Sequence, residues 1–458
     1  MRKVILPILL LILLIGTLNP TPSHAQDDAT LWFWATTPDG LVAYTLDGQI
    51  NVLTDDAVLQ DIPFPGTRLT ADSALIFDDE NRVVYRVTPT TVTPSAPLGE
   101  QFDLFRPLQY RHPYLLFTGM RVFPTAGILN VETMEVSPLT GFVFPNAPHM
   151  VFVDDTTLRY YSFSDAKGAT DAPSTLWERN LITGEETALL NFDQANYRVF
   201  YSQDGQQWWV VGRYNRETQM ADEVTTYGDV NPDVAAMLQT LDTYLINDWL
   251  VTIDTLCAAD CPVSIVPLAG GEPRTLTMPI NNPGQLLRIN TSLADGTLLL
   301  YDIPSETFYR LDPSGNLLVL GQADTRHMVP FLPPPTTQWV VTVNEQEDES
   351  LTYRLWDFAA GELIQEAPLE TFIGITYSTN GILLVNGRYY SLYTGDTMYD
   401  LSAHPGRFFQ PLANAQTLYS GSPDEPPGIY LYDAPSDTLT MLVQEGQPIP
   451  LAELSPVN

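Results

Sequence analysis

Clusters of carboxylates are the groups in this chain with the clearest chemical potential. Two carboxyl groups about 5 to 9 Å apart serve glycoside hydrolases, and clustered carboxylates hold calcium. The clusters are Asp55-Asp56, Asp78-Asp79-Glu80, Asp154-Asp155, Glu345 with Glu347-Asp348-Glu349, and Asp424-Glu425. None has the alternating Asp-x-Asp-x-Asp-Gly spacing of a calcium loop, and most stand at predicted hairpin tips, where Asp favours turns. We therefore expect no cofactor, with calcium at one such tip as the alternative.

Histidines and serines supply no catalytic motif. The spacing predicts that His112 and His149 lie between the first and second strands of their units, whereas His327 and His404 precede a first strand. Those positions are on opposite faces of a sheet array, so the four side chains cannot meet. The His-Glu-x-x-His, Gly-x-Ser-x-Gly and Gly-rich phosphate-binding patterns are absent. We therefore predict no catalytic, cofactor-binding or metal-ligating residues.

The first 25 residues have the pattern of a cleaved secretory signal. Arg2 and Lys3 precede an apolar run from Val4 to Gly16, and a small-residue site ends at Ala25. The run is too short to span a bilayer, and no later run approaches the roughly 20 apolar residues that a membrane helix needs. We expect an exported protein, periplasmic or secreted, with no membrane span after cleavage.

The charge of the chain excludes one class of partner. Without Arg2 and Lys3, 19 basic residues face 55 acidic ones, a net charge of about −36. A field of this sign repels phosphate backbones and anionic lipid headgroups. We therefore expect neither nucleic acid nor anionic membranes as partners.

Two cysteines, Cys257 and Cys261, are the only ones in the chain. In an exported protein, two cysteines this close predict a disulfide. Four residues of extended strand would separate their Cα atoms by about 13 Å, beyond the roughly 7 Å limit for a bridge. The segment is therefore expected to bend, with the disulfide closing a short loop and adding about 2 kcal/mol of stability.

A recurrent hairpin dominates the rest of the sequence. An aromatic-rich strand, a tight turn and a second alternating strand occur in VAYTLDGQINVLT, ERNLITGEETALL, YRLWDFAAGELIQEA, SLYTGDTMYDL and IYLYDAPSDTLTMLV. The turns fall near Asp47, Pro89, Thr133, Thr183, Gly270, Ser314, Ala360, Thr394 and Ser436. Their mean spacing of about 43 residues, counting the one double interval as two, matches a four-stranded propeller blade. Immunoglobulin-like sandwiches would repeat near 100 residues.

The fold class predicted from this repeat is an all-β propeller. Four-stranded antiparallel blades, seven to ten in number, are expected to form one toroid, with two smaller propellers in tandem as the alternative. Residues 26–458 would be a single domain. Leu31 begins what reads as a second strand, so the C-terminal tail IPLAELSPVN could supply the missing inner strand and tie the ends together.

One segment breaks the repeat. A helix is predicted near residues 231–241, with Asn231 as N-cap, Pro232 at its first position and Asp233 in its first turn. It belongs to an insertion around residues 212–245, a candidate partner contact or an ornamental loop. Eight tryptophans, most of them inside strands, are expected to pack between blades.

Several segments resemble known propeller families. YSQDGQQWWVV from Tyr201 resembles the Ser-Pro-Asp-Gly turn of TolB-like and prolyl-oligopeptidase-type propellers, and YRLWDFAAGELIQ from Tyr353 resembles a WD-repeat hairpin. SLADGTLLLYD and GIYLYDAPSDTLTML are less close matches. The resemblance implies a secreted bacterial β-propeller repeat protein without the peptidase catalytic domain.

The expected function is binding rather than catalysis. We expect an exported, monomeric and non-enzymatic scaffold for a protein, peptide or glycan ligand, with the Tyr201 to Leu241 region as its most distinctive patch. Function is expected where the repeat fails, above all between Tyr197 and Cys261. The alternative is an extracellular glycan hydrolase or lyase with acidic residues in the propeller channel.

Overall fold

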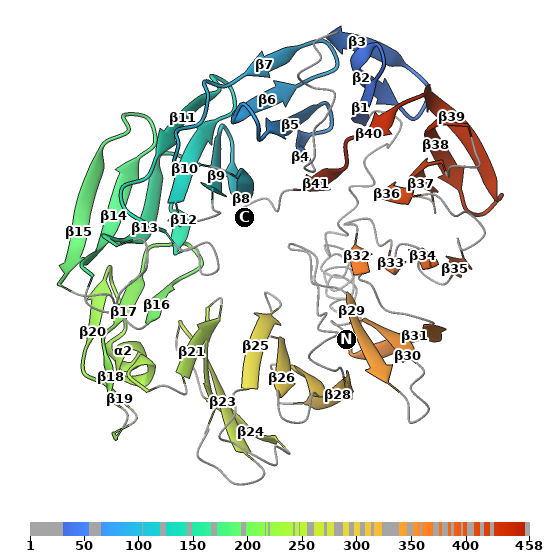
Figure 1. The fold of residues 1–458 in the computed structure, drawn as a ribbon. Helices are drawn as coiled ribbons and strands as arrows, with labels where there is room; N and C mark the ends of the chain where they lie inside the picture. Colours follow the sequence, from blue (N-terminus) through green and yellow to red (C-terminus); the bar gives the residue numbers. More distant parts are fainter. Residues whose placement is uncertain are drawn as a thin grey trace, which may run out of the picture.

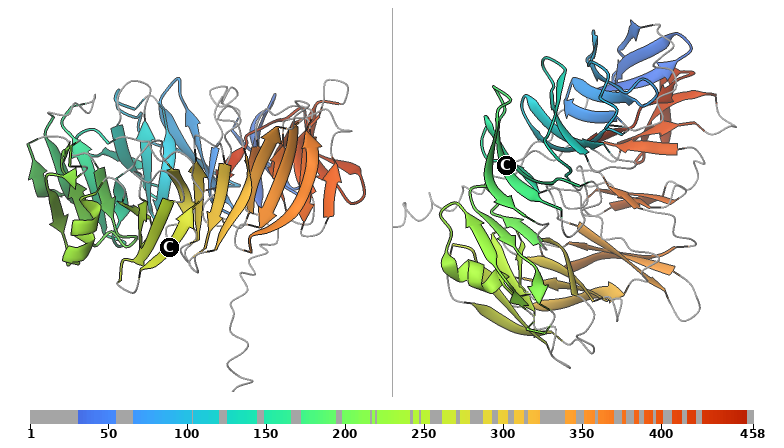
Figure 2. Two further views of the ribbon diagram at one scale, coloured as in Figure 1. Left: turned by 90° about the horizontal axis from the view of Figure 1, so that it is seen from below. Right: turned by 60° about the vertical axis from the view of Figure 1, so that its left-hand side comes forward.

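The computed structural model is an array of β-sheets around a central axis (Figure 1). The sheets stand side by side in a disc, with their strands running across its thickness (Figure 2). The structure describes residues 31–54, 66–102, 104–119, 125–143, 149–165, 172–193, 198–215, 217–218, 220–240, 243–246, 248–253, 261–269, 273–278, 287–292, 297–302, 307–312, 316–322, 339–345, 351–357, 360–369, 375–377, 383–385, 389–394, 397–400, 407–412, 416–421 and 426–453. The predicted signal segment, residues 1–25, lies outside these ranges.

Ten sheets of three to five strands occur in the described part of the chain, and we number them 1 to 10 in chain order. Sheet 1 contains β40 (Gln447–Pro448), β1 (Trp32–Thr37), β2 (Gly40–Thr45) and β3 (Ile50–Thr54). Sheet 2 contains β41 (Leu451–Glu453), β4 (Gly66–Thr70), β5 (Ser73–Asp78), β6 (Val83–Val87) and β7 (Val92–Pro94). Sheet 3 contains β8 (Arg106–Arg111), β9 (Tyr114–Gly119), β10 (Thr125–Asn130) and β11 (Glu135–Pro138). Sheet 4 contains β12 (Met150–Phe152), β13 (Thr157–Phe163), β14 (Ser174–Asn180) and β15 (Glu186–Phe192).

The remaining sheets continue the series. Sheet 5 contains β16 (Arg198–Tyr201), β17 (Trp208–Val211) and β20 (Val224–Tyr227), with a small hairpin, β18 (Tyr214–Asn215) and β19 (Met220–Ala221), between the last two. Sheet 6 contains β21 (Thr243–Ile246), β22 (Trp249–Ile253), β23 (Cys261–Pro267) and β24 (Arg274–Met278). Sheet 7 contains β25 (Leu287–Ser292), β26 (Leu298–Asp302), β27 (Thr307–Leu311) and β28 (Leu317–Gln322). Sheet 8 contains β29 (Trp339–Glu345), β30 (Leu351–Asp357) and β31 (Glu362–Leu369). Sheet 9 contains β32 (Ile375–Tyr377), β33 (Leu383–Val385), β34 (Tyr389–Thr394) and β35 (Thr397–Asp400). Sheet 10 contains β36 (Arg407–Pro411), β37 (Gln416–Ser420), β38 (Gly428–Asp433) and β39 (Thr438–Gln444).

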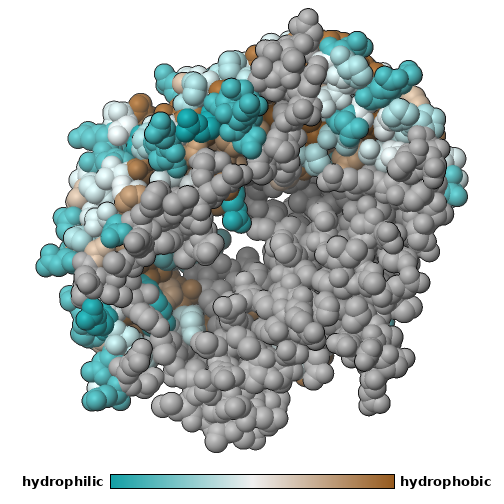
Figure 3. Space-filling model, viewed as in Figure 1, coloured by the Kyte–Doolittle hydropathy of each residue, from teal (hydrophilic) through white to brown (hydrophobic). Residues whose placement is uncertain are grey.

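This arrangement of antiparallel, mostly four-stranded sheets is a β-propeller architecture, as the repeat predicts. The core lies between neighbouring sheets. Trp34 of sheet 1 packs with Ala74 and Ile76 of sheet 2, and β5 and β17 are buried along their whole length because both of their faces are covered. On the face shown in Figure 3, hydrophilic residues dominate the described surface and apolar ones are visible among them.

The five hairpins read from the sequence are confirmed as β2–β3, β14–β15, β30–β31, β34–β35 and β38–β39. In five outer turns, the residue directly after the predicted turn position has a left-handed backbone. These residues are Gly48, Met134, Gly184, Gly361 and Asp437, with φ between 51° and 85°. A tight hairpin needs such a residue, which explains the recurrent Gly and Asp.

Both ends of the described chain meet in sheets 1 and 2. β40 pairs with β1, which is therefore the second strand of its sheet, as the sequence predicts. The tail then continues into β41, which pairs in parallel with β4 and adds a fifth strand to sheet 2. Sheets 1 and 10 share an apolar cluster that includes Phe33 and Leu418. The C-terminal tail thus joins elements from the two ends of the sequence.

The predicted helix is confirmed as α2 (Pro232–Leu238). The Asn231 side chain accepts a hydrogen bond from the Asp233 N–H, and Val234 and Leu238 are buried between sheets 5 and 6. Arg198 of β16 donates to the carbonyl oxygens of Leu238 and Thr240, at 3.1 and 2.6 Å, and so satisfies the C-terminal end of the helix. No helix among the described residues is long and apolar enough to cross a membrane.

Candidate functional site

The described carboxylate clusters act mainly in turns and ion pairs. Asp78 accepts hydrogen bonds from the backbone and side chain of Asn81. Asp154 accepts from Thr156, and Asp155 pairs with Arg111 at 2.7 Å. Asp55-Asp56, Glu347-Asp348-Glu349 and Asp424-Glu425 lie outside the described residues. In the part of the chain that the structure describes, no group of three His, Cys, Asp or Glu residues could hold a metal ion.

One histidine position requires a correction. His112 lies between β8 and β9, as predicted, and its ring contacts Tyr110 and Glu132. His149, however, precedes β12, the first strand of sheet 4, rather than lying between first and second strands. The strand that begins at Met150 is the first of its sheet and not the second, because β13, β14 and β15 complete the four strands after it. His327 and His404 lie outside the described residues.

His149 makes the stability of sheet 4 dependent on pH. Its ring stands edge-on to Tyr161, with centroids 6.1 Å apart, and burial lowers its pKa to about 4. The unfolded chain binds this proton at a pKa of about 6.5, so stability present above pH 6.5 is lost as pH falls toward 4.

We expect that loss to be about 2 kcal/mol between pH 7 and 4.5, less than the full effect because this interval ends above the folded-state pKa of about 4. His149→Gln should remove this component, while the carboxylate titrations common to both proteins remain. Urea unfolding of both proteins at the two pH values measures the difference. An identical pH dependence would contradict the assignment.

Of the two cysteines, Cys261 opens β23 and is buried. Cys257 lies outside the described residues. Packing of the tryptophans between sheets is confirmed for Trp34, Trp208 and Trp209, which are fully buried, and for Trp356, which is nearly so. Trp32, Trp177 and Trp249 are half-buried and pack against the same kind of core cluster. These rings therefore support the sheets and do not form an exposed stacking platform.

The turn of residues 202–207, which joins β16 and β17 just before the insertion, is held by several hydrogen bonds. The Ser202 N–H donates to the Gln207 carbonyl at 2.9 Å, and the Gly205 N–H donates to the Ser202 carbonyl at 2.8 Å. Asp204 Oδ1 accepts from the Ser202 hydroxyl and from the Gln206 N–H, at 2.5 and 3.0 Å. Gly205 has φ +68°, and a Cβ there would lie 2.6 Å from Val151, so only glycine fits without displacement.

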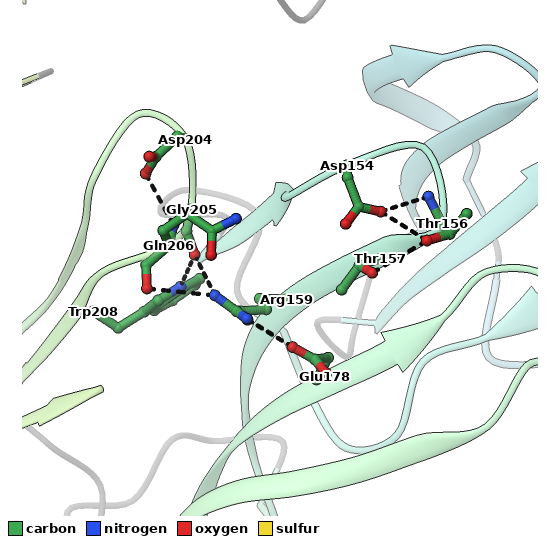
Figure 4. A network of polar contacts seen from close by, with 9 residues as sticks. All are labelled: Asp154, Thr156, Thr157, Arg159, Glu178, Asp204, Gly205, Gln206 and Trp208. Carbon is green, nitrogen blue, oxygen red and sulfur yellow. Dashed lines mark hydrogen bonds and ion pairs between the residues drawn. The ribbon is translucent and has the colours of Figure 1, made fainter. Parts of the chain in front are cut away.

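Arg159 of β13 holds this turn from the neighbouring sheet (Figure 4). Its Nη1 donates to the Gly205 carbonyl at 3.0 Å and to the Gln206 carbonyl at 3.4 Å. Its Nε and Nη2 contact Glu178 at 2.9 and 2.8 Å. The guanidinium also lies 4.9 Å from the centre of the Tyr227 ring. Because Arg159 is itself buried, it fixes the turn in place.

A cavity of about 490 Å³ opens beside the 202–207 turn, at the junction of sheets 5 and 6. Its lining comes from three connections. The residues are Ser202, Gln203, Asp204 and Gln207 of the turn, Asp248 between β21 and β22, and Leu268 and Ala269 after β23. The Gln203 N–H donates to Asp248 Oδ1 at 3.2 Å, and the Leu268 N–H donates to the Asp248 carbonyl at 2.7 Å. These bonds tie the three connections together.

The lining retains groups that can bind a ligand. Among the described residues, nothing bonds to the Oδ2 atoms of Asp204 and Asp248 or to the side-chain amides of Gln203 and Gln207. Among the lining residues that the structure describes, there is no histidine, cysteine or basic residue. Burial raises the pKa of the adjacent Tyr201, which stacks on Trp208, so its hydroxyl stays protonated. The site offers hydrogen bonds and negative charge, without an activated nucleophile.

Part of this lining lies in the segment that the sequence singles out. Tyr197–Cys261 contains the turn and Asp248, whereas Leu268 and Ala269 lie beyond it. Sequence reasoning missed Asp248, because a single Asp before a strand has no catalytic or ligand-binding spacing around it. One signal could have found it. Asp248 follows Gln203 by about one repeat length, so both occupy the same turn position in consecutive sheets.

Comparison with known proteins gives fold similarity only. No family model matches the sequence, and no curated protein matches it. Among solved structures, a eukaryotic initiation factor aligns over 92% of this chain and 99% of its own, with 10% identity and a TM-score of 0.42. Apo AztD from Citrobacter koseri aligns over 92% of this chain and 96% of its own, with 12% identity and a TM-score of 0.36. TolB from Acinetobacter baumannii aligns over 74% of this chain and 79% of its own, with 10% identity and a TM-score of 0.29.

Proposed function

We propose that this protein is an exported, non-enzymatic β-propeller that binds a protein, peptide or glycan ligand. The observation that carries the proposal is the cavity at the junction of sheets 5 and 6, with its unengaged amide and carboxylate groups. Such groups bind sugar hydroxyls, peptide amides or cationic side chains, and their charge rejects anions.

The topology supports a binding face at this point. In an antiparallel sheet of four strands, the turn between the first and second strands and the turn between the third and fourth emerge on the same face. The 202–207 turn and Asp248 belong to the first kind, and Leu268 begins a turn of the second kind. Loops from two sheets therefore converge on one ligand, as in other scaffolds that carry binding loops.

The finer structural features belong to the same proposal. Residues 1–25 would direct export, and residues 26–458 would form one domain whose sheets close into a single toroid through the C-terminal tail. Cys257 and Cys261 would form a disulfide that staples the loop before β23, which the oxidising exterior permits.

A ligand screen with matched variants tests the proposal. Immobilised wild-type protein is probed with a defined glycan array and a random-peptide library. We expect Asp248→Asn to weaken the selected ligand about tenfold, because one charge-assisted hydrogen bond is lost. Asp39→Asn, the same change in an exposed turn between β1 and β2 on the other face, should bind like the wild type.

Two results would contradict the proposal. One is the absence of any ligand in either library that distinguishes Asp248→Asn from the wild type. The other is release of reducing ends from a polysaccharide by the wild type, which would establish the glycan hydrolase or lyase alternative.

A further inference from the structure

Sheet 5 lacks the fourth strand that its neighbours have. Among the described residues it ends at β20, whereas sheets 4 and 6 continue to β15 and β24. Helix α2 does not take that place, because it lies on the side of β20 toward β21 and not beyond its outer edge (Figure 1). In the part of the chain that the structure describes, the rim position beyond β20, about 4.8 Å wide, therefore holds no strand, whereas the sheets on both sides have four.

The alternation of hydrogen-bonded and non-hydrogen-bonded residue pairs between β17 and β20 shows which backbone groups of β20 face away from β17. The Gly212 N–H donates to the Glu223 carbonyl at 2.8 Å, and the register pairs Val210 with Thr225. Inward bonding alternates along an antiparallel strand, so residues 223, 225 and 227 bond to β17. The N–H and C=O groups of Val224 and Thr226 point away from β17, and no described residue bonds to them.

Partly exposed apolar side chains flank this edge on both faces. Toward sheet 4, Leu190 and Phe192 of β15 pack in the same cluster as Tyr227. Toward sheet 6, Met237 of α2 packs in the same cluster as Val224. A strand added beside β20 would therefore find apolar contacts for side chains on each of its faces.

The charges at the two ends of β20 select the partner. Asp222 and Glu223 directly precede the strand, Asp229 follows it closely, and all three are exposed. The overall charge of the chain has the same sign. An added segment with Lys or Arg at its ends would be attracted, and an acidic one would be repelled.

We propose that the outer edge of β20 binds an extended segment of a partner protein, apolar in its centre and basic at its ends, as the fourth strand of sheet 5. Main-chain hydrogen bonds to Val224 and Thr226 would supply register, and the acidic ends would supply charge selection. This surface goes beyond the proposed cavity ligand and does not depend on it.

The test uses the full chain and a labelled probe peptide, Lys-Lys-Val-Thr-Val-Thr-Val-Lys-Lys. Thr226→Pro removes one outward N–H while leaving the bonds to β17 intact, a change that edge strands tolerate. We expect it to weaken the probe at least about tenfold, whereas Thr226→Ala, which keeps the N–H, should change affinity by less than about twofold. Asp39→Asn, which removes one negative charge from an exposed turn between β1 and β2, should leave the probe affinity unchanged.

A second measurement keeps the test valid if Thr226→Pro does not fold. Methylating alternate peptide nitrogens of the probe removes N–H donors and leaves the charge of the peptide unchanged. The methylated probe should no longer bind the wild type. Equal binding of methylated and unmethylated probes would mean charge attraction alone and would overturn the proposal. Equal binding of the probe to Thr226→Pro and Thr226→Ala would also overturn the proposal. A wild-type dimer that Thr226→Pro disrupts would overturn it as well, because the occupant of the edge would then be a second copy of this chain.

Discussion

Truncation after Gly446 is expected to lower the melting temperature by at least about 5 °C. The deleted tail contains β40 and β41, which supply inner strands to sheets 1 and 2. The Ile449 N–H donates to the Trp34 carbonyl at 3.0 Å, and the Gly66 N–H donates to the Pro450 carbonyl at 2.8 Å. Without the tail, two strand edges lose their partners.

Side-chain packing adds to this loss. Ile449 and Leu451 are buried in the cluster that joins sheets 1 and 2. Removing a buried aliphatic side chain costs about 2 to 5 kcal/mol, so the two together amount to at least about 4 kcal/mol. The backbone at Gly66 confirms how closely the tail is fitted, because a Cβ there would lie 2.9 Å from a methyl carbon of Leu451.

Differential scanning calorimetry of three proteins measures the effect. The full chain is compared with a truncation after Gly446 and with a control truncation after Glu453, which keeps both strands. The control should melt with the full chain. A truncation after Gly446 that melts within about 1 °C of the full chain would contradict the role assigned to the tail.

The repeat could be read from the sequence because its determinants are local. A left-handed residue at each turn must be Gly, Asp or a tolerant substitute, and central strands buried on both faces must be apolar. Helix α2 was equally predictable, since Asn231 and Pro232 mark its start. The strand count of sheet 5 was not predictable, because nothing in the sequence shows whether the inserted helix is added to a fourth strand or stands in the chain where that strand would be.

Contacts between sheets were hidden for a different reason. They join residues about one repeat apart, and nothing local marks them. Buried or half-buried arginines make many of these contacts by donating to carbonyl oxygens of an adjacent sheet. Arg68 donates to Trp32 at 2.9 Å, Arg86 to Val131 at 3.1 Å, Arg159 to Gly205 at 3.0 Å, Arg179 to Pro138 at 2.9 Å and Arg198 to Thr243 at 2.8 Å.

Lys167 is the only lysine after residue 25, and these contacts give a physical account of that scarcity. A guanidinium presents five donors in a rigid plane and can bond to several carbonyls and a carboxylate at once, which an ammonium group cannot match. Arg159 uses this capacity fully, because it joins Glu178 of its own sheet to the turn that lines the cavity. The cavity therefore depends on a residue outside its lining.

Replacing Arg159 by methionine is expected to destabilise the protein by about 3 kcal/mol. The change leaves the Glu178 carboxylate without its cation and removes the donor to the Gln206 carbonyl. The Gly205 carbonyl keeps one bond, from Trp208 Nε1 at 2.9 Å. The expected loss is at the low end for a broken buried pair because Glu178 is one-third exposed.

The double variant Arg159→Met, Glu178→Leu separates stability from binding. Removing both charges should restore most of the lost stability, because apolar side chains of similar volume can replace an ion pair at little cost. It should not restore ligand affinity, since the 202–207 turn still lacks its guanidinium donor. We expect both variants to bind the cavity ligand about tenfold more weakly than the wild type. Chemical denaturation measures the free energy of unfolding, and titration of the selected ligand measures the affinity. A double variant that recovers both quantities would show that Arg159 acts only through Glu178 and does not position the turn.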